Sequence, residues 1–298
     1  MIVVKLQGGL GNQMFQYALG RALAQKNDDD FALDLTFLLG GMLKENFVMR
    51  DYDLDIFAIE PRFTALSRVA QRLPMVRILY RANRGLVKLK SYMGIQRYVP
   101  ENEYKFHSEI LNLKGNIYLD GYWQSEKYFQ AAEDLLRSDF RLRAALSEKT
   151  RKMAEKIMAV NAVCINVRRG DFVNVPRSME THGFVGLEYY KRGLDALAAR
   201  ARGLHLFVSS DDMEWSMNNI HFDYPTTYLS HEYKGEKFGE YLYLMAMCQH
   251  FVIPNSSFAW WAAWLGQRPG KIVVAPQRWY LGKRKDPDDL VPSSWIRV

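Results

Sequence analysis

The sequence predicts an α/β protein with two domains, each a parallel sheet covered by helices, and three observations support this fold class. Short β-branched runs alternate with amphipathic segments along the chain, as in parallel sheets whose crossovers are helices. The length of 298 residues suits two domains of about 150 residues each. Four strand-like runs in the second half each end in a polar cluster. We place the boundary near residue 155, giving an N-terminal domain over 1–155 and a C-terminal domain over 156–298.

The first half begins with a buried strand at Ile2–Leu6, because all of its residues except one are apolar. After a glycine-containing turn, apolar residues from Met14 to Leu23 recur with the 3.6-residue period of a helix. The short apolar run Phe31–Leu35 is typical of the next strand. The remaining elements expected are two helical pieces within 62–97 separated by Pro74, a strand at Asn116–Leu119, and helices at Glu126–Arg137 and Ser147–Met158.

The second half repeats one arrangement four times, a short apolar strand followed directly by polar residues. The carboxyl ends of parallel strands share one edge of a sheet, where ligands bind and helix N-termini present N–H groups to anions. Arginines and serines converging there predict a site for a phosphorylated ligand. The strands and their loops are Val163–Val167 with Arg168-Arg169-Gly170-Asp171, Leu206–Val208 with Ser209-Ser210-Asp211-Asp212, Phe251–Ile253 with Pro254-Asn255-Ser256-Ser257, and Lys271–Val274 with Ala275-Pro276-Gln277-Arg278.

Composition excludes several classes of protein. Apolar residues make up 48% of the chain and charged residues 24%, which is typical of a globular and not a disordered protein. A net charge of +7 is modest, so no nucleic-acid partner is expected. Cys164 and Cys248 lie in apolar runs, which favours reduced thiols in a core and a reducing compartment. The apolar run Phe258–Leu265 is shorter than the roughly 20 residues of a membrane span, so we expect a cytoplasmic protein that does not span the membrane.

The segment between Arg62 and Arg97 holds nine basic residues and no acidic one, and so carries more positive charge than the net charge of the chain. Two interpretations stay open. Long basic side chains keep a surface helix soluble while their stems cover apolar surface, or the segment faces an anionic target such as the inner membrane leaflet or a lipid-linked glycan. The basic residues are Arg62, Arg68, Arg72, Arg77, Arg81, Arg84, Lys88, Lys90 and Arg97.

The turn Gly9-Leu10-Gly11-Asn12-Gln13-Met14 follows a strand and opens a helix, and Asp34 ends the next strand. This spacing nearly meets the dinucleotide-binding fingerprint, but Met14 occupies the place of its third glycine. A nicotinamide-dependent dehydrogenase that uses Gly9, Gly11 and Asp34 is therefore one alternative function. A tight turn that presents Asn12 and Gln13 into a cleft is the other interpretation.

Arg168 and Arg169 have a structural and a functional interpretation. Adjacent charges usually form surface ion pairs. A guanidinium fixed at the carboxyl edge of a sheet can instead bind a diphosphate and neutralise the charge that develops on a leaving group. Asp211 and Asp212 point apart as neighbours and lack further convergent oxygens, which favours a helix N-cap or a hydrogen bond to a base or ribose over a metal site.

Asn255, Ser256, Ser257 and Phe258 begin an aromatic helix with residues that favour N-cap positions. The asparagine and the serines at the positive end of this helix suit a phosphate. The tryptophans that follow favour a packed core over a stacking platform.

These motifs together resemble the bacterial α-1,2-fucosyltransferases of glycosyltransferase family 11. They run from residue 7 to residue 266 in the order typical of the family, and jointly they are specific. The motifs are Gly8-Gly9-Leu10-Gly11-Asn12-Gln13-Met14-Phe15-Gln16, Gly121-Tyr122-Trp123-Gln124-Ser125, Arg168-Arg169-Gly170-Asp171-Phe172, Ser210-Asp211-Asp212 and Asn255-Ser256-Ser257-Phe258-Ala259-Trp260-Trp261.

The resemblance implies a GT-B fold, with two Rossmann-like domains facing across a cleft. It implies an inverting transfer of L-fucose from GDP-β-L-fucose to the 2-hydroxyl of a galactoside in a surface glycan such as lipopolysaccharide, with no metal or other cofactor. Arg168 would hold the β-phosphate, Asp211 or Asp212 the guanosine, and Ser256 and Ser257 the diphosphate. The glycine-rich turn, with Gly9, Gly11 and Asn12, would line the cleft from the other domain.

Asn166 stands where the family pattern usually has a histidine, and an asparagine cannot carry a proton near neutral pH. A contact of Asn166 with the nucleotide remains open. Candidates for a base that accepts the proton of the acceptor hydroxyl are Asp171, His182 and Glu188. A non-catalytic protein that binds acidic glycans or lipid headgroups is the alternative outside the enzymes.

Overall fold

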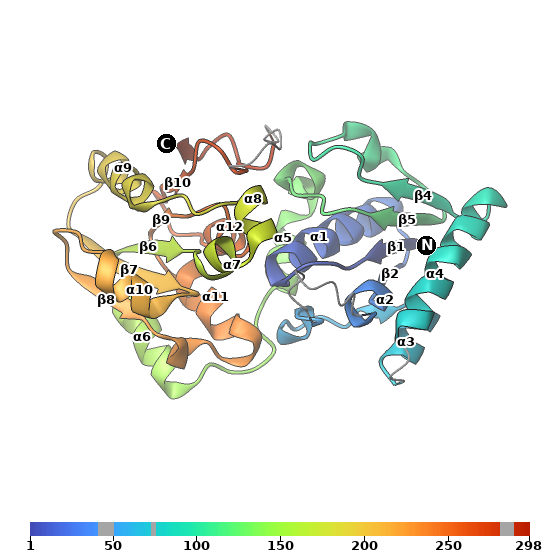
Figure 1. Ribbon diagram of the computed structural model, residues 1–298, viewed down its shortest axis with the longest axis horizontal. Coiled ribbons are helices and arrows are strands. Elements are labelled where there is room, and N and C mark those ends of the chain that lie inside the picture. Colours follow the sequence, from blue (N-terminus) through green and yellow to red (C-terminus); the bar gives the residue numbers. More distant parts are fainter. Residues whose placement is uncertain (41–50, 73–75, 281–288) are drawn as a thin grey trace. The chain divides into compact units, whose positions relative to one another are not determined.

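The computed structural model describes residues 1–40, 51–72, 76–280 and 289–298 (Figure 1). The chain divides into two compact units, Met1–Arg143 with Pro287–Pro292, and Ala144–Asp286 with Ser293–Val298. This division precedes the boundary expected near residue 155. The reason is helix α6 (Glu148–Met158), which packs on β6 (Asn161–Val167) and α11 (Gly239–Ala246) of the second unit.

The first unit contains a five-stranded parallel sheet in the order β3-β2-β1-β5-β4. Ile2 at the start of the central strand pairs with Phe31 on one side and Ile117 on the other. The sequence prediction missed the two edge strands, which carry few of the apolar residues that marked the others. The strands are β1 (Ile2–Lys5), β2 (Phe31–Asp34), β3 (Arg62–Phe63), β4 (Arg97–Pro100) and β5 (Ile117–Asp120).

Helices cover both faces of this sheet. Helix α1 (Leu10–Asn27) approaches β1 so closely that a Cβ on Gly20 would lie 2.5 Å from Val4 Cγ2. Helix α4 (Val76–Tyr92) packs on the opposite face, where Val87 joins Val3 and Tyr118 in one buried cluster. The other helices of the unit are α2 (Thr36–Leu39), α3 (Ala65–Ala70) and α5 (Glu133–Asp139).

The predicted pair of helices in the basic segment is confirmed as α3 and α4, while Pro74 lies outside the described residues. The single helix expected at Glu126–Arg137 is wrong. The backbone of Phe129, with φ −137° and ψ 12°, interrupts it, so two 3₁₀ turns precede α5. The 3₁₀ turns of this unit are Leu54–Ile56, Ser108–Asn112, Glu126–Tyr128 and Gln130–Ala132.

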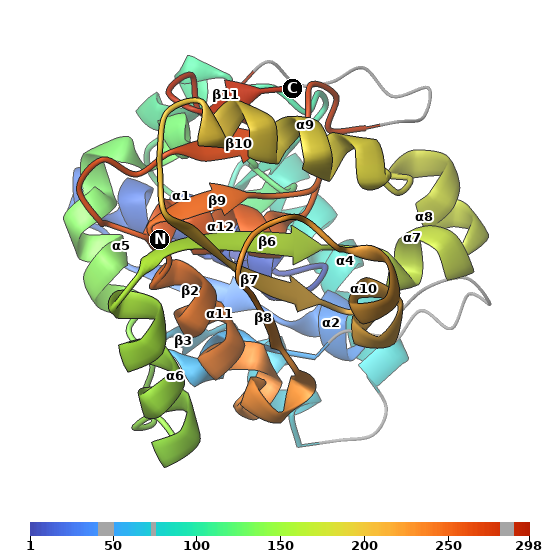
Figure 2. The same cartoon turned by 90° about the vertical axis from the view of Figure 1, so that its left-hand side faces the viewer.

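The second unit contains a six-stranded parallel sheet in the order β11-β10-β9-β6-β7-β8 (Figure 2). The four strands predicted in this half occupy its centre, and the two edge strands were not predicted. Besides β6, the strands are β7 (Leu204–Ser210), β8 (Thr226–Leu229), β9 (His250–Val252), β10 (Val273–Ala275) and β11 (Ile296–Arg297).

Successive side chains of β6 point to opposite faces of the sheet, so they enter two separate cores of this unit. Val163 and Ile165 pack with α9 (Leu187–Ala198), whose Gly193 lies so close to the sheet that a Cβ there would be 2.7 Å from Val252 Cγ1. Cys164 lies between them in the strand, and both cysteines are fully buried as reduced thiols, as predicted. The remaining helices are α7 (Gly170–Asn174), α8 (Pro176–Thr181), α9 (Leu187–Ala198), α10 (Met213–Asn219) and α12 (Ser257–Leu265), with 3₁₀ turns at His231–Tyr233 and Glu236–Phe238.

The tryptophans of α12 are buried and pack against one another, with Trp260 and Trp261 at 5.1 Å between ring centroids. Their assignment to the core is confirmed. No helix within the described ranges has the length and low charge that crossing a bilayer requires.

Candidate active site

The carboxyl edge of the second sheet brings the predicted polar loops together. Val167 of β6 pairs with Ser210 of β7, so the residues that follow, Arg168 and Asp211, leave neighbouring strands side by side. Two ion pairs connect these loops. Arg168 Nη1 lies 2.9 Å from Asp211 Oδ2, and Arg169 Nη1 lies 2.6 Å from Asp212 Oδ2.

The Asp211 carboxylate contacts both arginines. Its Oδ1 accepts the backbone N–H of Arg169 at 2.8 Å while Oδ2 pairs with Arg168. Gly170 makes room for the carboxylate, since a Cβ there would lie 2.8 Å from Asp211 Oδ2. The side chains of Arg168 and Asp211 are 27% and 23% exposed, so the pair is fixed and still reachable by a ligand.

Asp212 has a structural task. Its carboxylate caps α10 by accepting the backbone N–H of Trp215 at 3.2 Å, and the guanidinium of Arg169 lies 4.8 Å from the centre of the Trp215 indole. The N-cap expected for this pair of aspartates is confirmed at Asp212. Arg169 is held by Asp212 and Trp215.

Two side chains, the buried Tyr241 and the exposed His231, contact the backbone of Ser210 at the end of β7. The Tyr241 hydroxyl accepts the Ser210 backbone N–H at 3.0 Å and donates to the Leu229 carbonyl at 2.8 Å. Burial raises the pKa of this hydroxyl well above its ordinary value, so it stays protonated and can donate. His231 Nε2 lies 2.9 Å from the Ser210 carbonyl oxygen. Sequence reasoning missed both residues because they lie far from any motif.

Aromatic contacts connect Arg168 to His182. The Arg168 guanidinium lies 5.5 Å from the Phe172 ring centre, and Phe172 stacks on His182 at 5.0 Å with an interplanar angle of 8°. His182 also contacts Tyr280, at 5.4 Å. The structure therefore places His182 within the same cluster as Arg168, one aromatic ring away.

Asn255 is buried and joins three loops. Its Nδ2 donates to the backbone carbonyls of His182 at 2.9 Å and Trp279 at 3.0 Å. Its Oδ1 is buried and accepts no hydrogen bond from the described residues. Asn255 thus positions the loop that carries His182, and its remaining acceptor is directed into the interior.

Ser256 is the N-cap of α12, and its Oγ accepts the Ala259 backbone N–H at 3.5 Å. Ser257 and Phe258 form the first turn and are partly exposed. Asn166 faces the interior instead of the edge, because it is 6% exposed and its Nδ2 donates to Ser209 Oγ at 2.8 Å. The positions of Ser256 and Ser257 leave their predicted role open to test.

The other proposed bases differ in what the structure describes. Asp171 belongs to α7, but its side chain lies outside the described residues. Glu188 is exposed in the first turn of α9. Of the three candidates, His182 has contacts with the Arg168 cluster among the described side chains.

The glycine-rich motif belongs to the first unit. Gly9 is the N-cap of α1, Gly11 is buried in the first turn, and Asn12 Oδ1 accepts Gln124 Nε2 at 2.7 Å. Gln13 is fully buried and holds two loops, because its Nε2 donates to the Gly8 carbonyl at 3.0 Å and its Oε1 accepts the Asp53 backbone N–H at 2.9 Å. Much of this motif therefore stabilises the turn itself.

The dehydrogenase alternative fails at Asp34. This carboxylate is fully buried and accepts from the Thr36 backbone N–H at 2.9 Å, from Ser67 Oγ at 3.2 Å, and from Asn83 and Tyr118. An ionised carboxylate has about four acceptor sites, and here all are used inside the protein. Asp34 therefore cannot bind a ribose hydroxyl.

Glu101, which sequence reasoning missed, organises the carboxyl edge of the first sheet. Its carboxylate accepts the backbone N–H groups of Tyr122 at 2.7 Å and Trp123 at 2.9 Å. This explains a motif that begins with glycine, because a Cβ on Gly121 would lie 2.3 Å from Glu101 Cβ. No local signal in the sequence marks this role, because Glu101 follows the edge strand β4, which the apolar pattern did not reveal.

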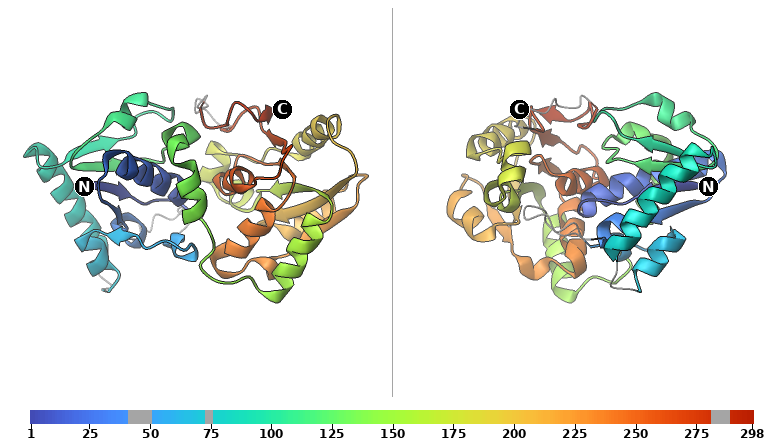
Figure 3. Two further views of the ribbon diagram at one scale, coloured as in Figure 1. Left: turned by 180° about the vertical axis from the view of Figure 1, so that it is seen from behind. Right: turned by 45° about the vertical axis from the view of Figure 1, so that its right-hand side comes forward.

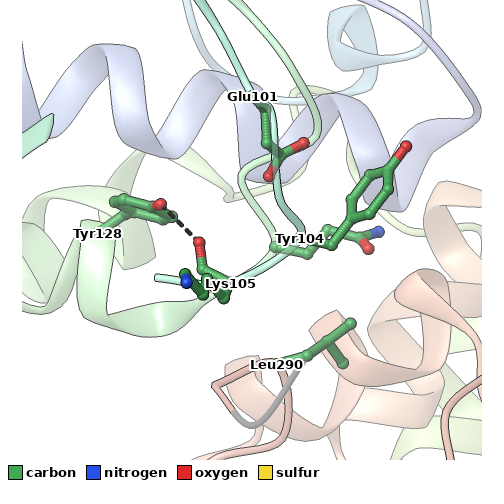
Figure 4. Close-up of a pocket in the computed structure, with 6 residues that line it drawn as sticks. Glu101, Tyr104, Lys105, Tyr128 and Leu290 are labelled. Carbon is green, nitrogen blue, oxygen red and sulfur yellow. Dashed lines mark hydrogen bonds between the residues drawn. The ribbon is translucent and has the colours of Figure 1, made fainter. Parts of the chain in front are cut away.

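A small pocket of about 10 Å³ opens beside Glu101 (Figure 4). Tyr128 closes one side by donating its hydroxyl to the Lys105 carbonyl at 3.1 Å. Gln124 also lines the pocket and connects it to Asn12. The residues that line it are Glu101, Tyr104, Lys105, Gln124, Tyr128 and Leu290. Its size suits a single hydroxyl-sized group.

Among the described residues, no group of three or more histidine, cysteine, aspartate or glutamate side chains is arranged to hold a metal ion. A divalent ion at Asp211 and Asp212 would have to displace an arginine from each carboxylate.

Comparison with known proteins points to one family. The model of the family described as Glycosyl transferase family 11 matches residues 75–298. An alpha-1,2-colitosyltransferase of Escherichia coli is 29% identical over all of this chain and 99% of its own length. The O-antigen biosynthesis glycosyltransferase WbnK of Escherichia coli is 28% identical over 98% of this chain and 99% of its own.

More distant relatives extend the comparison. A galactoside 2-alpha-L-fucosyltransferase of Caenorhabditis elegans is 28% identical over 59% of this chain and 48% of its own length. Among solved structures, a mutant of Arabidopsis thaliana FUT1 in complex with GDP superposes with a TM-score of 0.51 and 12% identity, covering 99% of this chain and 75% of that one. This likeness confirms the expected fold class, GT-B with two Rossmann-like domains.

Proposed function

Because the chain belongs to glycosyltransferase family 11, we propose that it transfers L-fucose from GDP-β-L-fucose to the 2-hydroxyl of a galactoside, with inversion at the transferred carbon. The observation that carries the proposal is the fixed Arg168–Asp211 pair at the carboxyl edge of the second sheet. Family relatives named as galactoside 2-alpha-L-fucosyltransferases support the acceptor position, and the full-length relative WbnK supports a surface glycan as the acceptor.

In this reaction the bond between the sugar and the β-phosphate breaks, so positive charge develops on the sugar and negative charge on GDP. A preorganised cation beside the departing diphosphate lowers the barrier without a metal. Arg168 fits this role because Asp211 and Phe172 hold it before any ligand binds. A guanidinium has five N–H donors, so one group can bind Asp211 and phosphate oxygens together. The N-terminus of α12, with Ser256 and Ser257, would bind the diphosphate in the same site.

The acceptor hydroxyl loses its proton as the new bond forms. We assign His182 as the base to test first, because it stacks on Phe172 within the Arg168 cluster. The carboxyl edge of the first sheet, with Asn12, Gln124 and Glu101, offers polar groups for the acceptor sugar.

The test combines GDP binding by calorimetry with transfer from GDP-fucose to a galactoside. Replacing Arg168 by alanine or lysine should reduce the transfer rate by about 10²–10³, as for the loss of one preorganised donor, because lysine cannot reproduce a guanidinium fork. Arg192→Lys on the exposed side of α9 is the matched control. Near wild-type turnover of Arg168→Lys would refute the role of Arg168.

A second donor sugar is favoured by one observation, the full-length relative named as a colitosyltransferase. Comparing kcat/KM for GDP-fucose and GDP-colitose on the same acceptor decides between them. The assignment to fucose fails if GDP-colitose is the better donor by tenfold or more.

A further inference from the structure

Helix α4 lies along the outside of the first unit (Figure 3). Its side away from the sheet exposes an apolar stripe. The inner side is fixed by Val87 and Asn83, which are buried against the sheet and beside Asp34. The exposed side carries large apolar residues at helical spacing. Their exposed fractions are 59% for Ile78, 39% for Leu86, 54% for Leu89, 92% for Tyr92 and 60% for Met93.

These residues lie on one face of the helix, because at about 100° of rotation per residue their positions fall within an arc of roughly 120°. Ala82 and Gly85 continue the face and are exposed as well. A soluble helix normally turns such a stripe inward. Here the inward side is already occupied by the sheet, so the stripe is a second apolar face of the same helix.

Basic residues flank the stripe. Arg81, Arg84 and Lys88 are exposed along one side of it. The elements with which α4 makes its main contacts, α2, α3 and β4, contain no acidic residue. No acidic side chain on these elements therefore neutralises the positive charge along the stripe.

We propose that α4 docks this protein onto an anionic lipid membrane, with the apolar stripe inserted at the headgroup level and the basic residues on lipid phosphates. An outward apolar face with lysine and arginine along its flank is the composition of helices that lie in the membrane interface. Tyr92 suits this depth, since its ring is apolar and its hydroxyl stays wet. A purely solubilising surface would not expose Ile78, Leu89 and Tyr92 together.

The test measures binding to vesicles of phosphatidylglycerol and phosphatidylethanolamine, and to neutral phosphatidylcholine vesicles. Wild type should sediment with the anionic vesicles at low salt and be released by about 1 M salt. Replacing Arg81, Arg84 and Lys88 together by Gln should weaken binding about a hundredfold, at roughly fivefold for each charge. Lys191, Arg192 and Arg200 of the second unit, replaced by Gln together, are the charge-matched control and should have a much smaller effect.

The apolar stripe is tested separately from the charges. Leu89→Gln with Tyr92→Gln should abolish most vesicle binding, whereas Met158→Gln with Met217→Gln, which are 48% and 51% exposed on other helices, should not. Because Cys164 and Cys248 are fully buried, Tyr92→Cys supplies an accessible thiol for an environment-sensitive dye. Its emission should shift to the blue on anionic vesicles, and a dye on Met217→Cys should stay unchanged.

Three results would overturn the proposal. The first is negligible binding of wild type to anionic vesicles at low salt. The second is binding that Leu89→Gln with Tyr92→Gln leaves unchanged, which would reduce the surface to charge alone. The third is self-association in solution that the same double variant abolishes, which would make the stripe an interface with a second copy. Transfer to a soluble acceptor should be unaffected by the α4 variants, so this test is independent of the proposed activity.

Discussion

Asp211→Asn is the change that best separates the two roles open to Asp211, contact with the nucleotide or positioning of Arg168. The substitution preserves the shape of the side chain and the acceptor for the Arg169 backbone N–H at 2.8 Å. It replaces Oδ2, which pairs with Arg168, by an amide NH₂ group. That group and Arg168 Nη1 are both hydrogen-bond donors, and they would face each other across the 2.9 Å that now separates Oδ2 from Nη1.

The magnitude follows from the lost hydrogen bond. A hydrogen bond to a charged group contributes about 1.5–3 kcal/mol. Both side chains are about a quarter exposed, which puts this pair at the lower end of that range. A loss of about 1.5 kcal/mol in the orientation of Arg168 corresponds to roughly tenfold weaker binding of GDP.

The assay is a double-mutant cycle on the dissociation constant of GDP, with wild type, Asp211→Asn, Arg168→Ala and the double variant. If Asp211 acts through Arg168, Asp211→Asn should weaken GDP binding about tenfold in wild type and less than about twofold once Arg168 is absent. Asp195→Asn, exposed on α9, is the control for a general change of charge. An equal loss in both backgrounds would refute positioning and assign Asp211 to the guanosine.

Three further predictions concern metal, pH and stability. Transfer should persist in excess EDTA, because Asp211 and Asp212 are each paired with an arginine; a requirement restored by one equivalent of Mn²⁺ would contradict this. Burial, and then the charge of Arg268, lowers the pKa of His250 below its ordinary value of 6.5, and its Nδ1 accepts the Ile272 N–H at 3.1 Å. The stability contributed by the neutral His250 imidazole is therefore complete above pH 6.5 and is lost as the pH falls through the lowered pKa. The Tm of the wild type should drop more between about pH 7.5 and 5 than the Tm of His250→Gln. Gln13→Ala should lower the free energy of unfolding by about 1–3 kcal/mol in urea, because it removes the bonds of this side chain to the partly buried Asp53 N–H and to the Gly8 and Asp51 carbonyls; a change below about 1 kcal/mol would show that water replaces them.

The central strands of both sheets were predictable, because buried parallel strands are continuous apolar runs such as Val163–Val167. The edge strands were not predictable, because strands such as Arg62–Phe63 and Thr226–Leu229 carry polar residues on a half-exposed edge of the sheet. The break at Phe129 was also hidden, because apolar periodicity survives a local change of backbone angle that ends a helix.

The candidate site was predictable where a residue directly follows a strand, as Arg168 and Asp211 do. The pairing of each arginine with its aspartate was not predictable, because it depends on the register of β6 against β7. Residues that support the site from other elements, such as Tyr241 and Glu101, have no local signal of their role. The outward face of α4 was hidden for a similar reason, since the sequence shows an amphipathic stripe but not which of its faces the sheet covers.

Salt should distinguish the two proposed surfaces, because their charges are arranged in opposite ways. At the donor site each arginine is compensated by an aspartate within 2.9 Å and is partly buried, so salt screens the pairs weakly. Along α4 the exposed basic residues have no acidic neighbour on α2, α3 or β4, the elements with which the helix makes its main contacts. Raising the salt from about 0.1 M to 1 M shortens the Debye length from about 10 Å to 3 Å. Vesicle binding should then fall by at least tenfold while the affinity for GDP changes by less than about threefold. Equal sensitivity of the two would mean that GDP binds through the net charge of the surface and not through the fixed Arg168 guanidinium.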